Sequence, residues 1–297
     1  MIDGCTRLVG LIGWPVEHSL SPAMHDAAFD AVSLNWRYVP LPVPPGQIEV
    51  AVRGLAALGF RGANVTVPHK QAVIPVLDSI APDAGEFGAV NTLVVERTDA
   101  GNAIISGCNT DHKGFISALR RDGFDPEGKS AVVVGAGGGG RAVVFGLLAA
   151  GAVDVLVLDL VSEKAETLVS DLESCNSSKL HTLPLASETL IESARSADLL
   201  VNATPVGMWP RKEESIWPEK VPVPRHLAVF DLIYNPLETK LLQQAREAEA
   251  HPIGGLEMLV GQGALAFERW TGRSAPIEVM RQACERALKA PDETRIR

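Results

Sequence analysis

Short apolar runs alternate with longer amphipathic stretches in the first third of the chain. The runs cover residues 8–12, 37–43 and 62–67, and helical spacing of apolar residues covers 22–32 and 48–58. This alternation predicts a βαβαβ arrangement of parallel strands. Two further runs, 89–96 and 103–107, flank the polar turn 97–102, and they predict a hairpin added to the same sheet.

A second pattern begins after a polar segment. Residues 120–130 are polar and contain Gly123, Pro126 and Gly128, which favours a domain boundary near 108–128. Beyond it we predict a strand at 131–134, a glycine turn at 135–140, a helix at 141–150, and strands at 153–159, 199–203 and 228–233. Continuous apolar runs of this kind are typical of a parallel sheet covered on both faces.

The last long periodic segment runs from Gly255 to Gly272. It predicts a helix with one apolar stripe, made by Leu256, Leu259, Val260, Gly263, Phe267 and Trp270. We expect this helix to return to the first domain. The fold class is therefore α/β with two domains: an N-terminal α/β domain (1–110 and 255–297) and a Rossmann-type doubly wound domain (111–254).

Composition narrows the classes of function. The chain has 297 residues, 46% of them hydrophobic, which is enough to fill two cores. A formal net charge of −9 argues against a nucleic-acid or anionic-membrane partner, since both usually require clustered Lys and Arg. The start of the chain lacks the ordered regions of a signal peptide, and no apolar run approaches the ~20 residues that a membrane span needs.

Cysteine and histidine usage indicates neither disulfides nor a metal. Cysteines 5, 108, 175 and 284 are scattered with no CxxC pair, which favours a reduced, cytoplasmic setting. His18 and His25 could share a helix face, but capping or packing explains them better than metal binding. We expect no metal site.

A glycine-rich turn between a strand and a helix predicts a nucleotide site. It consists of Gly135, Ala136, Gly137, Gly138, Gly139 and Gly140. Glycines here allow a tight turn and let a pyrophosphate approach the amides of a helix start. A merely flexible turn is the alternative, and the strands on both sides weigh against it.

Asp159 ends the strand that follows this helix, where such folds place the group that meets the adenosine ribose. A carboxylate there accepts hydrogen bonds from the 2′-hydroxyl and repels a 2′-phosphate, so NAD is favoured over NADP. Lys164 could still pair with a phosphate, and a solvated strand-end charge is the other interpretation of Asp159.

Four more motifs occur in order along the chain: Gly13 to Pro22, Asn64 to Lys70, Gly88 to Thr92, and Gly107 to Asp111. The pattern continues through Asn202 to Met208 and Gly255 to Gln262. Together these motifs resemble the shikimate and quinate dehydrogenase family over nearly the whole chain. The resemblance implies hydride transfer between a nicotinamide dinucleotide, NAD or NADP, and a ring hydroxyl of a small cyclohexene or cyclohexane carboxylate, namely shikimate/3-dehydroshikimate or quinate.

Lys70 is the predicted proton-transfer residue. Pro68 favours the first turn of a helix, so Lys70 is expected near a helix start, where the dipole and partial burial favour a neutral amine. The resemblance implies that Asp111 supports Lys70 beside the reacting hydroxyl; spacing alone does not show it. An exposed lysine at a helix start is the alternative interpretation.

Polar side chains in the first domain are the candidates for binding substrate. Ser19 and Ser21, beside Pro22, indicate a capped helix start able to hold an anion, and by resemblance they bind the carboxylate. The resemblance places substrate contacts at Thr66, Asn91, Asp111 and Gln262, whose alternative roles are turn and sheet hydrogen bonds. Tyr38 and Tyr234 are further candidates for which packing competes equally.

The remaining cofactor candidates follow buried strands or begin the last helix, where switch-point loops normally line a nicotinamide. They are Thr204, Gly207, Met208, Ile233, Gly255 and Met258.

One departure from the family pattern leaves alternatives open. Asp159-Leu160-Val161 stands where NADP-using members commonly carry Asn-Arg-Thr, so the planar arginine fork suited to a 2′-phosphate is lost. An NAD-dependent enzyme of quinate use is the alternative enzyme. A catalytically silent dinucleotide-binding sensor is the alternative from another class, and the Lys70 and Asp111 pair counts against it. The residues leave a homodimer open.

Overall fold

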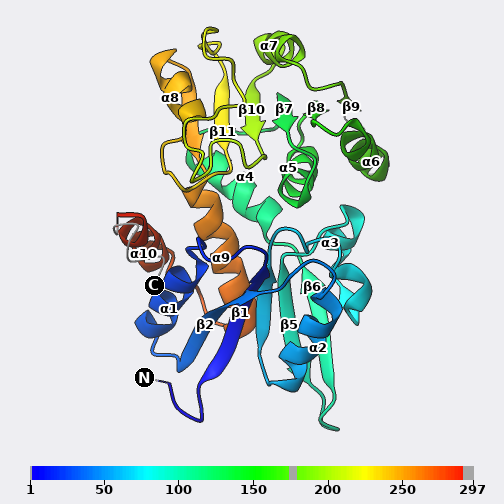
Figure 1. Cartoon of the computed structure of the whole chain (residues 1–297), viewed down its shortest axis with the longest axis vertical. Coiled ribbons are helices and arrows are strands. Elements are labelled where there is room, and N and C mark those ends of the chain that lie inside the picture. The colour runs from blue at the N-terminus through cyan, green and yellow to red at the C-terminus, as the bar shows by residue number, and fades with distance from the viewer. Residues whose placement is uncertain (1, 174–178, 290–297) are drawn as a thin grey trace. The chain divides into compact units, whose positions relative to one another are not determined.

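The structure is a computed structural model that describes residues 2–173 and 179–289 (Figure 1). The chain divides into two compact units: unit 1 comprises Met1–Thr110 with Val260–Arg297, and unit 2 comprises Asp111–Leu259. The chain returns from unit 2 to unit 1 at Val260, inside the helix Leu256–Thr271. The sequence patterns had predicted this boundary at residue 255, before that helix.

Unit 1 is built on a mixed six-stranded sheet. Its strands are β1 (Arg7–Gly13), β2 (Trp36–Pro42), β3 (Gly62–Val65), β4 (Ser79–Ile80), β5 (Thr92–Arg97) and β6 (Ala103–Cys108), in the order β2-β1-β3-β5-β6-β4. Strands β1, β2 and β3 run parallel, as the βαβαβ pattern predicted. The predicted hairpin is present as antiparallel β5 and β6, with β5 antiparallel to β3.

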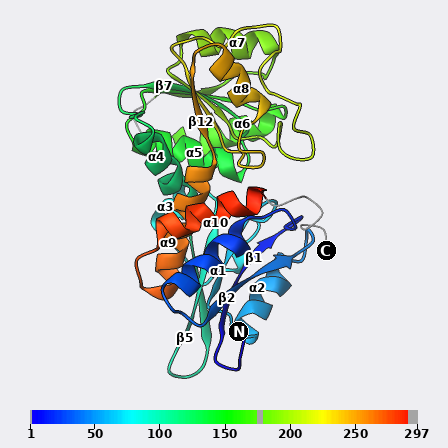
Figure 2. The same ribbon diagram turned by 90° about the vertical axis from the view of Figure 1, so that its left-hand side faces the viewer.

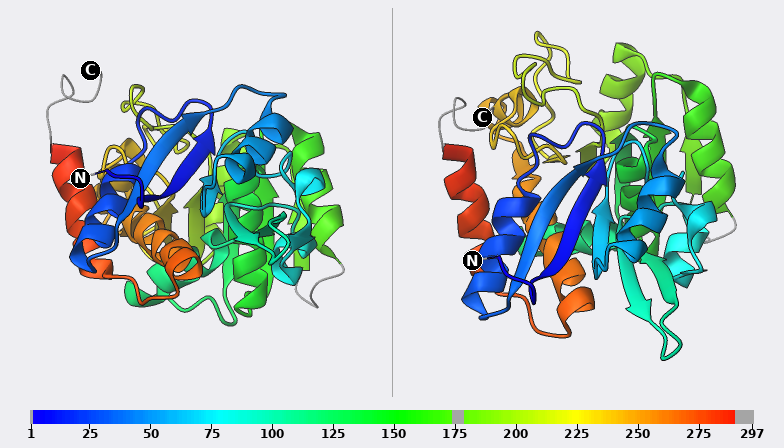
Figure 3. Two further views of the ribbon diagram at one scale, coloured as in Figure 1. Left: turned by 90° about the horizontal axis from the view of Figure 1, so that it is seen from below. Right: turned by 60° about the horizontal axis from the view of Figure 1, so that its bottom comes forward.

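Helices cover both faces of this sheet. They are α1 (Ser21–Ala31), α2 (Ile48–Ala57), α3 (Pro82–Glu86), α10 (Ile277–Lys289), the 3₁₀ turn η1 (Ile74–Val76), and the part of α9 (Leu256–Thr271) that belongs to unit 1. Val52 and Leu55 of α2 pack with Leu93 of β5 in one apolar cluster. On the other side of β1 and β2 lies α1, with α10 beside it (Figures 2 and 3).

Unit 2 is a parallel sheet of the doubly wound type. Its strands are β7 (Ser130–Val134), β8 (Asp154–Leu158), β9 (Lys179–Thr182), β10 (Leu199–Asn202), β11 (Ala228–Asp231) and β12 (His251–Gly254), in the order β12-β11-β10-β7-β8-β9. Because β10 lies on one side of β7 and β8 on the other, the strand order reverses at β7, which defines the switch point where such folds bind ligands.

The helices of unit 2 are α4 (Asp111–Arg121), α5 (Gly138–Ala149), α6 (Ser162–Leu172), α7 (Ser187–Ser196) and α8 (Lys240–Glu247). Helices α4 and α5 pack together, and Phe115 of α4 meets Phe230 of β11 edge to face. Leu190 of α7 and Leu241 of α8 belong to a cluster with Val132 of β7, so both sheet faces are covered.

Sequence patterns missed the three short strands β4, β9 and β12 and misplaced the start of α5. Strand β4 has two residues, and β9 and β12 have four residues each with polar residues or a proline among them, so none of the three shows an apolar run. Helix α5 begins at Gly138, three residues before the predicted start, because the Gly137 carbonyl accepts the Arg141 amide at 2.9 Å. Within the described part of the chain, no helix combines the length and apolarity that crossing a bilayer requires.

Candidate active site

The glycine turn of unit 2 is shaped by close backbone approaches. Gly135 has φ +109°, and a Cβ there would lie 2.8 Å from the Ala203 carbonyl oxygen. A Cβ at Gly140 would lie 1.8 Å from the Gly135 carbonyl oxygen. Gly137 is the N-cap of α5, and a Cβ there would meet no atom within 4 Å. The turn thus has glycines where only glycine fits, and open space over the helix start where a pyrophosphate can approach.

Asp159 is tied to this turn. One carboxylate oxygen accepts the Ala136 amide at 2.7 Å, and the other accepts the Val161 amide at 2.9 Å. Each oxygen retains a lone pair for a ribose hydroxyl. Leu160, the middle residue of Asp159-Leu160-Val161, is 85% exposed. It presents an apolar side chain to solvent, where an arginine at the same position would present a positive charge.

A buried carboxylate holds the loops that follow β10 and β11. Asp231 accepts hydrogen bonds from the Asn202 amide at 3.0 Å, the Thr239 hydroxyl at 2.7 Å and the Ile233 backbone amide at 3.1 Å. Burial raises the pKa of the Asp231 carboxyl to about 6, against these three hydrogen bonds, which lower it. Sequence analysis missed this role, although an acidic residue ending an apolar strand was a visible signal.

The other cofactor candidates of unit 2 lie on or next to these loops. The Asn202 side-chain oxygen accepts both the backbone amide and the hydroxyl of Thr204 at 3.1 and 2.7 Å, which fixes the turn leading to Gly207 and Met208. Gly255 passes so close to the end of β11 that a Cβ would lie 2.4 Å from the Leu232 carbonyl oxygen. Exposure varies within the set: Ile233 and Met258 are buried, and Met208 is 46% exposed. The substrate candidate Tyr234, next to Ile233 in the chain, is half-buried.

In unit 1, the candidate substrate residues Thr66 and Asn91 lie at the carboxyl ends of β1 and β3. Gly13 ends β1, and a Cβ there would lie 2.4 Å from the Thr66 methyl carbon, so glycine makes room for Thr66. The Asn91 carbonyl accepts the Val65 amide at 2.8 Å, which places Asn91 beside the same strand end.

Asn91 is the centre of a buried polar cluster. Its side-chain amide donates to the Thr110 hydroxyl at 3.0 Å and to Gln262 Oε1 at 3.4 Å. Its side-chain oxygen accepts the Thr110 backbone amide at 2.8 Å and the Thr92 hydroxyl at 2.8 Å. The structure therefore brings together two predicted substrate residues, Asn91 and Gln262, that are 171 positions apart. Thr110, which sequence analysis did not single out, directly precedes Asp111.

Tyr38 is connected to this cluster through Asn64. The Tyr38 hydroxyl donates to Asn64 Oδ1 at 2.9 Å, and the Asn64 amide donates to the Asn91 carbonyl at 3.2 Å and the Thr92 hydroxyl at 3.1 Å. Tyr38 is 3% exposed, and its ring stacks on His25 at 4.6 Å between centroids. Its contact with substrate stays a prediction, and its position in the core favours an indirect role.

Ser19 and Ser21 stand at the start of α1. Ser19 Oγ accepts the Ser21 amide at 3.2 Å, so a side chain does satisfy an amide of this helix start. The N-cap position itself is Leu20, whose side chain cannot cap, and Ser21 is the first helical residue.

Lys70 does not lie at the start of a helix, so that prediction was wrong. Residues after Pro68 form turns, and the next regular element is η1 at Ile74–Val76. Pro75 is the reason, because it lacks the N–H that an α-helix would bond to Gln71 and disfavours helical geometry at Ile74. The helix-dipole argument for Lys70 therefore falls. The Lys70 carbonyl accepts the Val90 amide at 2.8 Å, which holds its segment beside Asn91.

Asp111 is buried and is the first residue of α4 and of unit 2. No group of three or more His, Cys, Asp and Glu side chains able to hold a metal occurs among residues 2–173 and 179–289. In the same residues Cys5, Cys108 and Cys284 are free thiols, and Cys175 lies outside them.

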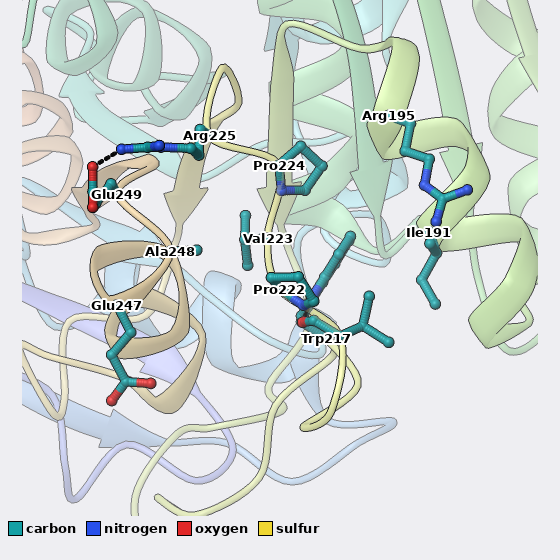
Figure 4. Close-up of a pocket in the computed structure, with 11 residues that line it drawn as sticks. Ile191, Arg195, Trp217, Pro222, Val223, Pro224, Arg225, Glu247, Ala248 and Glu249 are labelled. Atoms are coloured by element: carbon teal, nitrogen blue, oxygen red, sulfur yellow. Dashed lines mark hydrogen bonds and ion pairs between the residues drawn. The ribbon is translucent and has the colours of Figure 1, made fainter.

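A cavity of about 550 Å³ in unit 2 contains none of the candidate residues. Arg195 of α7, Trp217 and the Pro222–Pro224 segment line it, with Arg225 paired to Glu249 at its rim (Figure 4). These residues precede the amino ends of β10, β11 and β12, whereas the glycine turn follows the carboxyl end of β7.

Comparisons with known proteins agree with the motifs. Residues 11–93 match the profile described as shikimate dehydrogenase substrate binding domain, and residues 255–285 match the shikimate 5′-dehydrogenase C-terminal domain. A protein of Methanopyrus kandleri named shikimate dehydrogenase (NADP(+)) is 47% identical over 95% of this chain and 96% of its own.

Solved structures agree too. A shikimate dehydrogenase in complex with NADP⁺ superposes with a TM-score of 0.87 at 40% identity, covering 98% of both chains. A quinate dehydrogenase from Corynebacterium glutamicum in complex with NAD superposes with a TM-score of 0.83 at 31% identity, covering 94% of this chain and 98% of its own.

Proposed function

The chain belongs to the shikimate dehydrogenase family, and from this premise we propose how its own residues carry out the reaction. It is an oxidoreductase acting on a CH–OH group, and its reaction is the reversible NAD(P)-dependent reduction of 3-dehydroshikimate to shikimate, a step in aromatic amino acid biosynthesis. A silent dinucleotide sensor is not favoured, because the relatives at this identity are named as enzymes.

The polar cluster of unit 1 supports the assignment of substrate-binding residues. Ring hydroxyls need donors and acceptors in fixed directions, and Asn91 and Gln262 are held by the hydrogen bonds they exchange with Thr110 and with each other. Thr66 adds a hydroxyl at the neighbouring strand end. Ser19 and Ser21 hold the carboxylate of the substrate at the start of α1.

Lys70 and Asp111 carry the proton chemistry. The nicotinamide ring, when bound, gives or accepts the hydride at its C4 carbon. Lys70 takes the proton from the substrate hydroxyl during oxidation and returns it during reduction, and Asp111 orients the Lys70 ammonium and stabilises it electrostatically. Asp111 directly follows Thr110, whose backbone amide and hydroxyl are hydrogen-bonded to Asn91. These bonds fix the backbone that carries the Asp111 side chain.

The test of this proposal is Lys70→Met, which removes the amine and keeps most of the apolar side chain. We expect turnover to fall by about 10²- to 10⁴-fold, while shikimate still binds. Lys220→Met, at an exposed lysine of unit 2, is the matched control and keeps normal turnover. Near-normal turnover of Lys70→Met would show that another group moves the proton.

We propose further that NAD is the preferred dinucleotide, although the relative from Methanopyrus kandleri is named for NADP⁺. The support is Asp159, whose carboxylate adjoins the glycine turn and repels a 2′-phosphate, together with Leu160 in place of an arginine. An assay that crosses shikimate and quinate with NAD and NADP tests substrate and cofactor at once. The expected best pair is shikimate with NAD.

Leu160→Arg tests the physical basis of the preference. The new guanidinium should raise kcat/KM for NADP by about tenfold and leave NAD use nearly unchanged. Val153→Arg, an exposed position just before the amino end of β8, carries the same charge change and should alter neither. A wild-type enzyme that uses NADP better than NAD would end this part of the proposal.

Use of quinate, a homodimer and a cytoplasmic location stay predictions. The scattered cysteines favour the last of these.

A further inference from the structure

A cleft lined by arginines lies at the end of the unit 1 sheet away from the substrate residues. Arg7 opens β1 and Arg61 immediately precedes β3, whereas Gly13 and Thr66 stand at the other ends of the same strands. Arg97 and Arg269 complete the cationic lining, and the cleft encloses about 390 Å³.

The four guanidinium groups have no ion pair within the described part of the chain. Arg7 lies over the Trp36 ring at 5.7 Å, and Arg97 donates to two carbonyl oxygens, of Ala56 at 2.9 Å and of Gly101 at 3.3 Å. These neutral partners orient two of the arginines and leave their charge uncompensated. Arg61 and Arg269 have neither an ion pair nor a side-chain hydrogen bond there.

The charge of the cleft contrasts with the rest of the molecule. The chain carries 27 Lys and Arg against 36 Asp and Glu, yet Glu96 is the one acidic side chain that lines the cleft. Four arginines line this one small space, and like charges so placed repel one another unless an anion is present. Guanidinium groups match phosphate and carboxylate oxygens with paired N–H donors, so the counter-charge they suit is an oxyanion.

The back of the cleft is rigid. The Trp270 indole N–H donates to the Leu93 carbonyl at 2.9 Å, and a Cβ at Gly62 would lie 2.4 Å from the same indole nitrogen. Arg61 directly precedes Gly62, the first residue of β3, and Arg269 directly precedes Trp270 on α9. The backbone of both arginines is therefore held next to this contact between Gly62 and Trp270.

From these observations we infer that the cleft binds a compact anion with two or more negative charges, of phosphate or carboxylate type. Its volume suits a small molecule, and the net charge of −9 opposes a nucleic acid. This site is separate from the catalytic residues and does not depend on the proposed reaction.

The experiment is calorimetric titration with inorganic pyrophosphate, and in a second arm with citrate. The enzyme is first saturated with shikimate and reduced dinucleotide, which cannot react with each other and which occupy the two catalytic binding regions. The variants are Arg61→Gln and Arg269→Gln, and Arg53→Gln is the control, because Arg53 is an exposed arginine of α2 paired with Glu49. Unfolding midpoints without anion verify that each variant folds.

We expect the wild type and Arg53→Gln to bind at least one of the two anions, and each cleft variant to bind it about tenfold more weakly, with turnover unchanged. The two arms decide between phosphate and carboxylate. Absence of binding of both anions to the wild type at millimolar concentration, or equal weakening in Arg53→Gln, would overturn the inference.

Discussion

At the scale of single residues, His25 has an unusual environment. It is fully buried, and its two ring nitrogens have no hydrogen-bond partner among residues 2–173 and 179–289. Tyr38 and Trp270 lie against its ring at 4.6 and 5.3 Å between centroids. Burial lowers the pKa of His25 from 6.5 to about 3. The imidazole of His25 is therefore neutral in the folded protein and acts as an aromatic packing group.

This burial makes stability depend on pH. Between pH 6.5 and about 3 the unfolded state binds a proton at His25 and the folded state does not, so the free energy of unfolding falls as the pH falls. From pH 7 to pH 5 the loss due to His25 is about 2 kcal/mol. His25→Phe keeps the ring packing and should remove this part of the pH slope. Urea unfolding of both proteins at the two pH values measures it, and an unchanged slope would contradict the prediction.

Tyr38 is a second residue whose role is decided by its contacts. Tyr38→Phe removes the hydrogen bond to Asn64 and keeps the stacked ring, at a cost of about 1 kcal/mol. Because Asn64 also donates to the Asn91 carbonyl and to Thr92, we expect KM for shikimate to rise about three- to tenfold with KM for the dinucleotide unchanged. A lowered unfolding midpoint with both KM values unchanged would indicate packing alone.

At the scale of elements, different glycines of the nucleotide turn are expected to serve stability and dinucleotide binding. Gly140→Ala puts a Cβ on the Gly135 carbonyl and should destabilise unit 2 by about 1–3 kcal/mol. The methyl group of Gly137→Ala meets no described atom within 4 Å, so the free energy of unfolding should stay within about 0.5 kcal/mol of wild type. The same methyl group occupies the approach to the α5 amides, so dinucleotide binding should weaken. Thermal unfolding and dinucleotide titration of both variants test the distinction; equal effects on both properties would refute it.

At the scale of the whole molecule, the two sets of candidate residues belong to different units. Ser19, Thr66, Asn91 and Gln262 are in unit 1, and the glycine turn is in unit 2. A ligand stabilises the region that binds it, by about 2.7 kcal/mol at a hundredfold excess over its Kd. Hydrogen exchange should therefore slow in residues 2–110 and 260–289 with shikimate alone, and in 111–173 and 179–259 with dinucleotide alone. Protection spread equally over both units by either ligand would contradict this assignment.

Local patterns were enough for the main elements and for the nucleotide turn. The alternation of apolar runs predicted parallel β1, β2 and β3 and the β5–β6 hairpin, because side-chain periodicity along a strand or helix is a local property. The turn from Gly135 to Gly140 was recognisable for the same reason, since its close approaches lie within a few residues.

Contacts between distant segments decided the rest. The sequence contained Tyr38, Asn91 and Gln262, but only packing could place Tyr38 in the core and bring Gln262 to Asn91 from 171 positions away. It could not show that Asp231 holds the β10 and β11 loops. The error at Lys70 is different, because Pro75, close by in the chain, was a local signal against a helix that the prediction overlooked. The sequence by itself therefore determined which chemical groups this protein has and where the longer strands and the nucleotide turn lie. The tertiary structure decided which groups meet, because hydrogen bonding and burial depend on neighbours that chain spacing does not specify.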